Sequence, residues 1–426
     1  MRGTRLLVLL GGEMDNGRPA AYVTGIGVVS PVGVGRRRFW EALLACESGM
    51  GPITLFDPEG FEVRIAAECN DFDPKEFMDR KMVPRTDRFG QMALASAKLA
   101  LEDAGAWGLL QERPERVGLI LGSGLGGATS LEDTQRVMDT RGPARVGPFA
   151  VTKIMPNSAA AHIGIQLGVQ GPSAAPALAC ACGTDAMGLG YDLIRRGDAD
   201  AVICGASEAV ITPVIVAGFT AMRAMSRRND DPEGACRPYD ADHSGFVIGE
   251  GAAVLLLESA ESVRRRGAEP YAKITGVGRT TDAYNMTDPD PKGRGILRAM
   301  QLALKEAGIP GERVGYINPH GTGTPAGDAP ESRAMEAINP RVKVSATKST
   351  LGHSMGATGA IEAAICALAV KERTVPPMRN LEQLAEDCAR LDYVVNEPRE
   401  VPDLEVAVCA NLGVGGHNAA VVLERV

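Results

Sequence analysis

The segment VTGIG at residues 23–27 returns almost unchanged as ITGVG at residues 274–278. Three more segments of the first half have counterparts in the second half: RVGLI (116–120) and RVGYI (313–317), AVIC (201–204) and VAVC (406–409), GAAVLLL (251–257) and NAAVVL (418–423). The counterparts come in the same order in both halves. One short match would be chance, but four in order seldom are. The sequence therefore predicts a chain built from two copies of one fold.

The repeated segments are short, apolar runs bounded by glycine, which is typical of buried strands. Between them lie Ala- and Leu-rich segments of helical length at residues 91–104, 185–196 and 357–371. Gly105 and Gly197 follow two of these segments, at the position of a helix C-cap. Strands that alternate with helices predict an α/β fold with mixed, largely parallel sheets covered by helices.

The chain divides into three parts. We expect residues 1–18 to be an appendage, with Met14 as a candidate start codon, residues 19–268 to form an N-terminal half, and residues 269–426 a C-terminal half. The boundary at residue 268 follows RRRG, which is typical of a helix end. Because the sequence there is not rich in Pro or Ser, we expect the halves to share a layer of helices.

The composition is that of an ordinary globular protein. Hydrophobic residues make up 45% and charged residues 23% of the chain, and its net charge is −8. This acidity argues against a nucleic-acid or anionic-membrane partner, although a local basic patch could still bind an acidic protein. The nine cysteines form no C-x-x-C pair, so we expect a reduced, cytoplasmic protein without structural zinc. No apolar run reaches the roughly 18 residues of a membrane span.

The segment ACACG at residues 179–183 carries the candidate nucleophile. Residues 176–180 predict a buried strand and a helix follows, so Cys180 is expected at a strand-to-helix turn. Free N–H groups at a helix start lower the pKa of a thiol and can bind a developing oxyanion. Packing is the alternative role for any cysteine. Cys182 is rotated from Cys180 by about 200° on a helix, so we expect Cys180 to react and Cys182 to pack or form pocket wall.

Two of the five histidines lie in Gly-rich loops: His320 in PHGTGTP and His353 in TKSTLGH. Two neutral imidazoles can donate hydrogen bonds to one thioester oxygen and so stabilise an enolate. A lone histidine is more often structural, but two in similar loops favour catalysis. We expect His162 to be structural, whereas His417, in the Gly-rich turn at 413–418, could line the site, although a structural role is favoured.

Lys348 precedes His353 by five residues and follows a strand-like segment, so we expect it to be buried. A buried lysine needs an acidic partner, and Glu331 is the candidate. We expect this pair to orient the histidines rather than to carry protons. Neither His-Glu-x-x-His nor another ligand cluster occurs, so no metal is predicted. The isolated GSGLGG at 122–127 is too weak a match to predict a nucleotide site.

Together these motifs resemble the β-ketoacyl-acyl-carrier-protein synthases, condensing enzymes of the thiolase superfamily, over residues 21–426. The matching motifs are GPS (171–173), HGTGTP (320–325) with Asp328 and Glu331, Lys348 with GH (352–353), and GVGG (413–416). RAMSRRND (223–230) and IMPN (154–157) are similar to actinobacterial elongating synthases. The resemblance implies a duplicated thiolase fold in five αβαβα layers and a Cys-His-His site. It also implies a homodimer, or a heterodimer with a ketosynthase-like subunit.

The resemblance assigns roles to further residues. Thr322 and Thr324 would hold the carrier protein's phosphopantetheine arm, and the N–H groups of Cys180 and Val414 would form the oxyanion hole. Leu125 and Phe219 would line the acyl pocket. The acidic acyl carrier protein would be faced by Arg80, Lys81 and Arg85. No cofactor beyond the carrier's phosphopantetheine is implied.

Three positions depart from the family pattern, one of which is Cys182, in place of a polar residue two after the nucleophile. Val414 and Leu412 stand where the family usually has phenylalanines, one of which is a gate between acylation and condensation. Smaller gates imply bulkier or more unsaturated acyl chains, or a looser order of the two half-reactions. These departures favour a specialised synthase over a housekeeping one.

The predicted activity is decarboxylative condensation of an acyl group on Cys180 with malonyl-carrier protein, in fatty acid or polyketide biosynthesis. One alternative is an acyltransferase that uses the same site without condensation. Another is a chain-length partner subunit, but such subunits are expected to lack the nucleophile, so Cys180 and both histidines argue against it. A thiolase would carry a second catalytic cysteine near the C-terminal Gly turn, and none follows Cys409.

Overall fold

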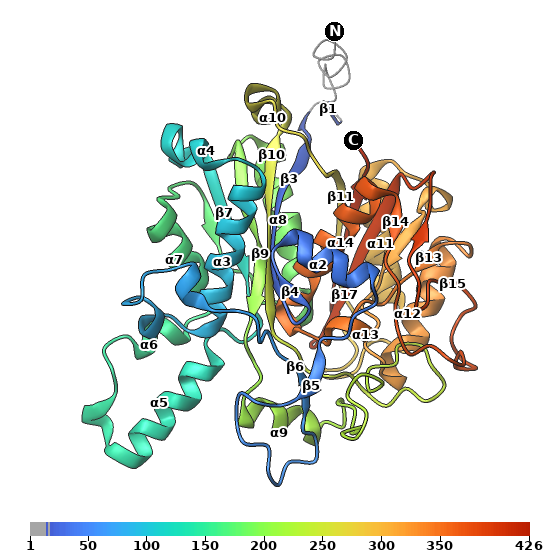
Figure 1. The fold of residues 1–426 in the computed structure, drawn as a ribbon. Coiled ribbons are helices and arrows are strands. Elements are labelled where there is room, and N and C mark those ends of the chain that lie inside the picture. The colour runs from blue at the N-terminus through green and yellow to red at the C-terminus, as the bar shows by residue number, and fades with distance from the viewer. Residues whose placement is uncertain (1–13, 16–17) are drawn as a thin grey trace.

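The computed structural model describes residues 14–15 and 18–426, and one continuous sheet made of two similar halves runs through it (Figure 1). The strands of the N-terminal half lie in the order β3 (Ala21–Ser30), β10 (Gly251–Ser259), β9 (Ala201–Glu208), β7 (Val117–Gly122), β8 (Ser173–Ala174). Those of the C-terminal half lie in the order β11 (Ala272–Thr281), β18 (His417–Glu424), β17 (Val406–Gly413), β12 (Tyr316–Asn318), β13 (Lys343–Val344), β15 (Asp392–Tyr393). The halves join where β11 pairs with the start of β3.

The repeated sequence segments form equivalent strands, so the predicted duplication is confirmed. β3 corresponds to β11, β10 to β18, β9 to β17 and β7 to β12. In each half the first three of these strands pair antiparallel and the next pairing is parallel. The sheet is mixed, as predicted. The prediction that it is largely parallel is wrong, because four antiparallel pairings have eight residue pairs each, whereas the longest parallel pairing, β7 with β9, has six.

Helices cover both outer faces and fill the space between the two halves of the sheet. α3 (Arg88–Asp103) packs on β3 and β10, and α11 (Arg294–Ala307) packs on β11 and β18. Between the halves, α8 (Cys182–Arg196) packs against α14 (Thr358–Glu372), which is buried on every side from Thr358 to Val370. The described chain therefore has the expected αβαβα layers, with the shared helical layer in the middle (Figure 1).

The repeated T-G-x-G motif explains how the outer helices reach the sheet. A Cβ added to Gly27 would lie 1.9 Å from the Ser96 carbonyl oxygen of α3, and one added to Gly278 would lie 1.9 Å from the Ala299 carbonyl oxygen of α11. Atoms in normal contact stay about 3.5 Å apart. The glycines of VTGIG and ITGVG thus allow one close helix-on-strand contact in each half.

The predicted helices at 91–104, 185–196 and 357–371 are observed as α3, α8 and α14, with no end shifted by more than three residues. The predicted boundary at residue 268 lies between α10 (Ala260–Arg266) and β11. Of the predicted appendage, residues 1–13 and 16–17 lie outside the described residues, and β1 (Met14–Asp15) pairs with β2 (Arg18–Pro19). The start at Met14 stays a prediction.

Among the described residues, every helix is too short or too polar to cross a bilayer.

Candidate active site

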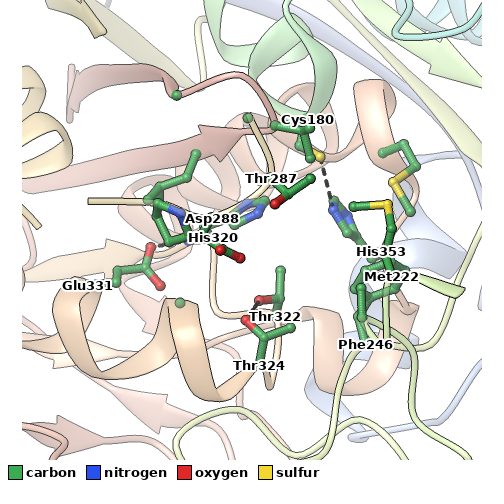
Figure 2. Close-up of a pocket in the computed structure, with 18 of the residues that line it drawn as sticks. Cys180, Met222, Phe246, Thr287, Asp288, His320, Thr322, Thr324, Glu331 and His353 are labelled. Carbon is green, nitrogen blue, oxygen red and sulfur yellow. Dashed lines mark hydrogen bonds between the residues drawn. The ribbon is translucent and has the colours of Figure 1, made fainter. Parts of the chain in front are cut away.

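A cavity of about 120 Å³ is lined by residues of both halves of the chain (Figure 2). Its lining includes the predicted residues Cys180, His320, His353, Glu331, Thr322, Thr324, Phe219, Leu412 and Val414. The Cys180 Sγ and a ring nitrogen of each histidine lie within 4.8 Å of one another. The fold therefore brings one thiol of the first half and two imidazoles of the second half to a single point.

Cys180 lies in a short 3-10 turn, η5 (Ala179–Ala181), directly before α8. The predicted strand at 176–180 is wrong, because this segment is described without strand pairing. Ala179 takes φ 48° and turns the chain into the helix. A non-glycine residue in this conformation costs about 1–3 kcal/mol and is typical of functional sites.

Burial has the largest effect on the pKa of the Cys180 thiol. It raises the pKa of the Cys180 thiol from 9.0 to about 11. The prediction of a lowered pKa is wrong, because the loss of water outweighs the favourable effects of the Lys348 charge and of the Val414 and Cys180 backbone N–H groups. These two N–H groups donate toward the sulfur, at the place where the resemblance puts the oxyanion hole.

His353 is held beside Cys180 by contacts of both its ring and its backbone. Its Nε2 lies 3.2 Å from the Cys180 Sγ, and its Nδ1 lies 3.0 Å from the Thr358 Oγ1 at the start of α14. Its backbone N–H donates to the Val247 carbonyl at 2.7 Å. The Phe246 ring packs edge-on against the imidazole, with centroids 5.1 Å apart. His353 can therefore take the thiol proton without moving (Figure 2).

Glu331 fixes the loop that carries His320. Its carboxylate accepts hydrogen bonds from the backbone N–H groups of His320 at 2.6 Å and Gly321 at 2.8 Å, and from the Tyr239 hydroxyl at 2.9 Å. Burial raises the pKa of Glu331 to about 7. The predicted ion pair between Glu331 and Lys348 is wrong, because Glu331 is occupied by the loop that it supports.

The partner of Lys348 is Glu362, from the buried helix α14. The Lys348 Nζ lies 2.5 Å from the Glu362 Oε1, and both side chains are 2% exposed. Burial raises the pKa of Glu362 to about 7, although the lysine opposes this rise. The sequence did hold a signal for this pair, since Glu362 is the acid within the apolar run AIEAAICALAV at 360–370.

Both imidazoles are neutral near pH 7. Burial and, after it, the Lys348 charge hold the pKa values of His320 and His353 well below 6.5. The rings face each other edge to face, with centroids 5.1 Å apart. Two neutral rings can both donate to one oxygen. In the described part of the chain, the Cys180 sulfur and the ring nitrogens of His320 and His353 are close enough together to bind a metal ion. The positive charge of Lys348 would nevertheless repel a cation.

The other predicted residues divide into those that line the cavity and those that lie elsewhere. The Thr322 and Thr324 hydroxyls lie at the cavity, 2.9 Å apart, and Phe219 of α9 (Pro213–Ala221) contributes to the wall. Leu125 is 44% exposed and is not among the residues that line this cavity, so its place in the acyl pocket stays a prediction. Its loop wraps a buried carboxylate: the Leu125 N–H donates to the Glu208 Oε1 at 3.2 Å.

The remaining predicted residues lie away from the reacting atoms. Cys182 is buried and accepts a hydrogen bond from the Leu178 N–H at 2.9 Å, so it packs rather than lining the cavity. Arg80, Lys81 and Arg85 are exposed. His162 and His417 do not line the cavity.

Sequence reasoning missed several residues of the site. Met222, Phe246 and Met355 form its apolar side, Thr287 and Asp288 contribute from the loop after β11, and Asn411 of β17 contacts His320. The Met and Phe residues carry no local motif, so their role could not be predicted from the sequence.

Replacing Lys348 with methionine is expected to slow alkylation of Cys180 by iodoacetamide at pH 8–9 and to shift the rise in reactivity to higher pH. The lysine lowers the thiol pKa, so its loss raises that pKa and decreases the thiolate fraction. Glu362 would also be left buried without its counter-ion, which costs about 3–5 kcal/mol of stability. Peptide mass spectrometry measures the first effect and denaturant unfolding the second.

Lys371→Met is the matched control, because its ion pair with Glu269 is exposed and worth about 1 kcal/mol or less. Equal effects of the two substitutions would contradict the role of Lys348.

Comparisons with known proteins agree with this geometry. The family model "Beta-ketoacyl synthase, N-terminal domain" matches residues 20–262, and "Beta-ketoacyl synthase, C-terminal domain" matches residues 271–382. The 3-oxoacyl-[acyl-carrier-protein] synthase 2 of a Synechocystis strain is 42% identical over 410 residues, which cover 95% of this chain and 97% of that protein.

Two solved structures are also similar to this chain. The ishigamide ketosynthase/chain length factor has a TM-score of 0.89 and 34% identity, and the match covers 96% of this chain and 100% of that one. A ketosynthase structure with its type II polyketide synthase acyl-carrier protein has a TM-score of 0.87 and 29% identity, with the same coverage of 96% and 100%.

Proposed function

The chain belongs to the β-ketoacyl synthase family and is an acyltransferase, and from this premise we propose that it extends acyl thioesters by decarboxylative condensation with malonyl-carrier protein. The observation that carries the proposal is the convergence of the Cys180 Sγ with ring nitrogens of His320 and His353 within 4.8 Å. The proposed pathway is fatty acid biosynthesis, since the synthase 2 relative is 42% identical and the polyketide ketosynthase 29%. Polyketide biosynthesis is the second candidate.

The first half-reaction loads Cys180. The thiol proton moves to the His353 Nε2 as the sulfur attacks the acyl carbonyl of acyl-carrier protein. A bond forms between the Cys180 sulfur and the acyl carbon, while the bond from that carbon to the carrier's sulfur breaks. His353 keeps this proton on Nε2 and releases its Nδ1 proton to solvent, while the carrier's thiolate takes up a proton from solvent and leaves as a thiol. The N–H groups of Cys180 and Val414 stabilise the tetrahedral oxyanion.

The second half-reaction makes the carbon–carbon bond. Malonyl-carrier protein loses carbon dioxide, and the electron pair of the broken bond forms an enolate whose oxygen accepts hydrogen bonds from neutral His320 and His353. The enolate carbon attacks the acyl carbon on Cys180. The carbon–sulfur bond breaks, the Cys180 thiolate takes the proton back from the His353 Nε2, a solvent proton restores Nδ1, and the β-ketoacyl product stays on the second carrier. No metal or redox cofactor takes part in this scheme.

The cavity supports a substrate arm that enters past the threonines. The hydroxyls of Thr322 and Thr324 can bind the amides of phosphopantetheine, and Leu412 and Val414 lie on the cavity wall. Val414 is 38% exposed, so a small side chain there leaves the entrance open to bulky acyl groups. This is the role that we propose for the departure from phenylalanine at the gate.

The proposed partners are an acyl carrier protein and a second ketosynthase-like subunit, in the cytoplasm. Exposed Arg80, Lys81 and Arg85 suit an acidic carrier. A subunit interface is supported at the β8 end of the sheet, where Ile165 is 78% and Val151 68% exposed on neighbouring helices. All nine cysteines are free, which suits a reducing compartment.

Intact mass spectrometry tests the function. The enzyme is mixed with a panel of acyl-carrier proteins and then with malonyl-carrier protein, while released carbon dioxide is measured. We expect the acyl mass to appear on Cys180 and to disappear as carbon dioxide and a chain two carbons longer form. Loading without carbon dioxide would instead identify an acyltransferase without condensation. Absence of loading would identify a partner subunit.

A further inference from the structure

Asn411 lies next to His320, on the face of β17 that contacts the central helices α8 and α14. It is fully buried, and its Nδ2 lies 3.4 Å from the His320 Nδ1. The same Nδ2 lies 2.6 Å from the Glu362 Oε2, and the Thr184 Oγ1 donates to the Asn411 Oδ1. One amide therefore connects the catalytic ring to α8, α14 and the Lys348–Glu362 pair.

These contacts fix the orientation of the amide. Glu362 pairs with Lys348 through its Oε1, and the ionised carboxylate of this pair can only accept hydrogen bonds, so the atom facing its Oε2 must be the amide nitrogen. A flipped amide would place two acceptor oxygens 2.6 Å apart. The Thr184 hydroxyl holds the other end by donating to the amide oxygen. Both hydrogens of Nδ2 are then accounted for, one toward Glu362 and one toward His320.

We propose that Asn411 is a positioning residue that holds His320 in the tautomer with its proton on Nε2. A donor facing the His320 Nδ1 requires that this nitrogen accept, and in a neutral ring the proton then sits on the other nitrogen. That proton is the one that must point at the enolate oxygen. This inference rests on the proposed condensation, for which it names the group that prepares His320 as a donor.

Among the described contacts of the His320 ring, the one with Asn411 is the contact that can set this tautomer. Glu331 binds the backbone of His320 rather than its ring, and His353 meets the ring edge to face. Because burial and Lys348 keep the ring neutral, the two tautomers compete. With the proton on Nδ1, two N–H groups would face each other and Nε2 would offer only a lone pair to the enolate, which would repel it.

Asn411→Asp tests the inference, because it replaces the donor with a group that accepts from the ring. In protein with 15N-labelled histidine, the wild-type His320 signals, assigned by their absence in His320→Gln, should show a protonated Nε2 and a bare Nδ1. The aspartate variant should move the proton to Nδ1. Carbon dioxide release from malonyl-carrier protein should fall about 10²-fold, as for loss of one oxyanion donor, while acyl loading of Cys180 keeps its rate.

Cys409→Ala is the matched control, because Cys409 is equally buried on the same face of β17 and its sulfur contacts Asn411, Thr184 and Gly359 but not His320. This variant should keep the wild-type tautomer and carbon dioxide release. A wild-type His320 with its proton on Nδ1 would overturn the inference even if Asn411→Asp did not fold. An unchanged tautomer in folded Asn411→Asp would also overturn it. Wild-type protein that releases no carbon dioxide would refute the proposed function instead, while the spectrum still reports the tautomer.

Discussion

Cys180→Ala is expected to abolish acyl-enzyme formation and condensation while carbon dioxide release from malonyl-carrier protein stays measurable. Alanine removes the sulfur that accepts the acyl group, so no second route to the product exists. The two histidines, for which we propose the stabilisation of the enolate, keep their supports in Glu331 and Thr358. Condensation should fall by at least about 10⁴-fold, in line with loss of a catalytic nucleophile. Intact mass spectrometry and carbon dioxide capture measure the two activities separately.

Cys182→Ala is the control for this result. Its thiol lies two residues away and is as well buried, but it accepts a hydrogen bond from Leu178 and does not line the cavity. The variant should load acyl groups and condense them, with a moderate loss of stability from the buried gap. Acyl mass on Cys182 in the Cys180→Ala protein would contradict the assignment of the nucleophile.

His320→Ala is expected to lower malonyl decarboxylation by about 10²–10³-fold, the range for removal of one oxyanion donor, with acyl loading retained. His320 does not contact the Cys180 sulfur among the described hydrogen bonds, whereas the His353 Nε2 lies 3.2 Å from it. His353→Ala should therefore slow both half-reactions. The thiol pKa of about 11 makes loading depend on a nearby base at neutral pH. Single-turnover loading and carbon dioxide release distinguish the two variants.

His162→Ala serves as the reference, because His162 does not line the cavity. It should leave both half-reactions at their wild-type rates. Equal losses of loading in His320→Ala and His353→Ala would contradict the division of labour between the two rings.

Much of the fold follows from local sequence. The T-G-x-G segments predict strands that pack tightly against a helix, because glycine alone fits where Gly27 meets Ser96 and Gly278 meets Ala299. The order of the repeated segments predicts equivalent strands in the two halves, and the structure places them so. Gly197 with φ 74° ends α8 at the predicted residue.

The convergence of Cys180, His320 and His353 at one cavity was also predictable, since each stands in a short motif. Their supports were less so. Glu331 was correctly chosen as a residue of the site but given the wrong partner, and Glu362 was overlooked although it is an isolated acid in an apolar helix. Which carboxylate reaches a buried lysine depends on how two distant segments pack.

By itself, the sequence determined that the chain is a duplicated α/β protein with one thiol and two imidazoles set in turns, because strand, helix and turn preferences act over a few neighbouring residues. The tertiary structure decided how those groups behave. Burial raises the pKa of the Cys180 thiol although it stands at the start of a helix, which favours the thiolate. Burial and the Lys348 charge keep the His320 ring neutral, and Asn411 of β17 contacts that ring. Desolvation and charge act through space, so these properties exist only once both halves have closed around the cavity.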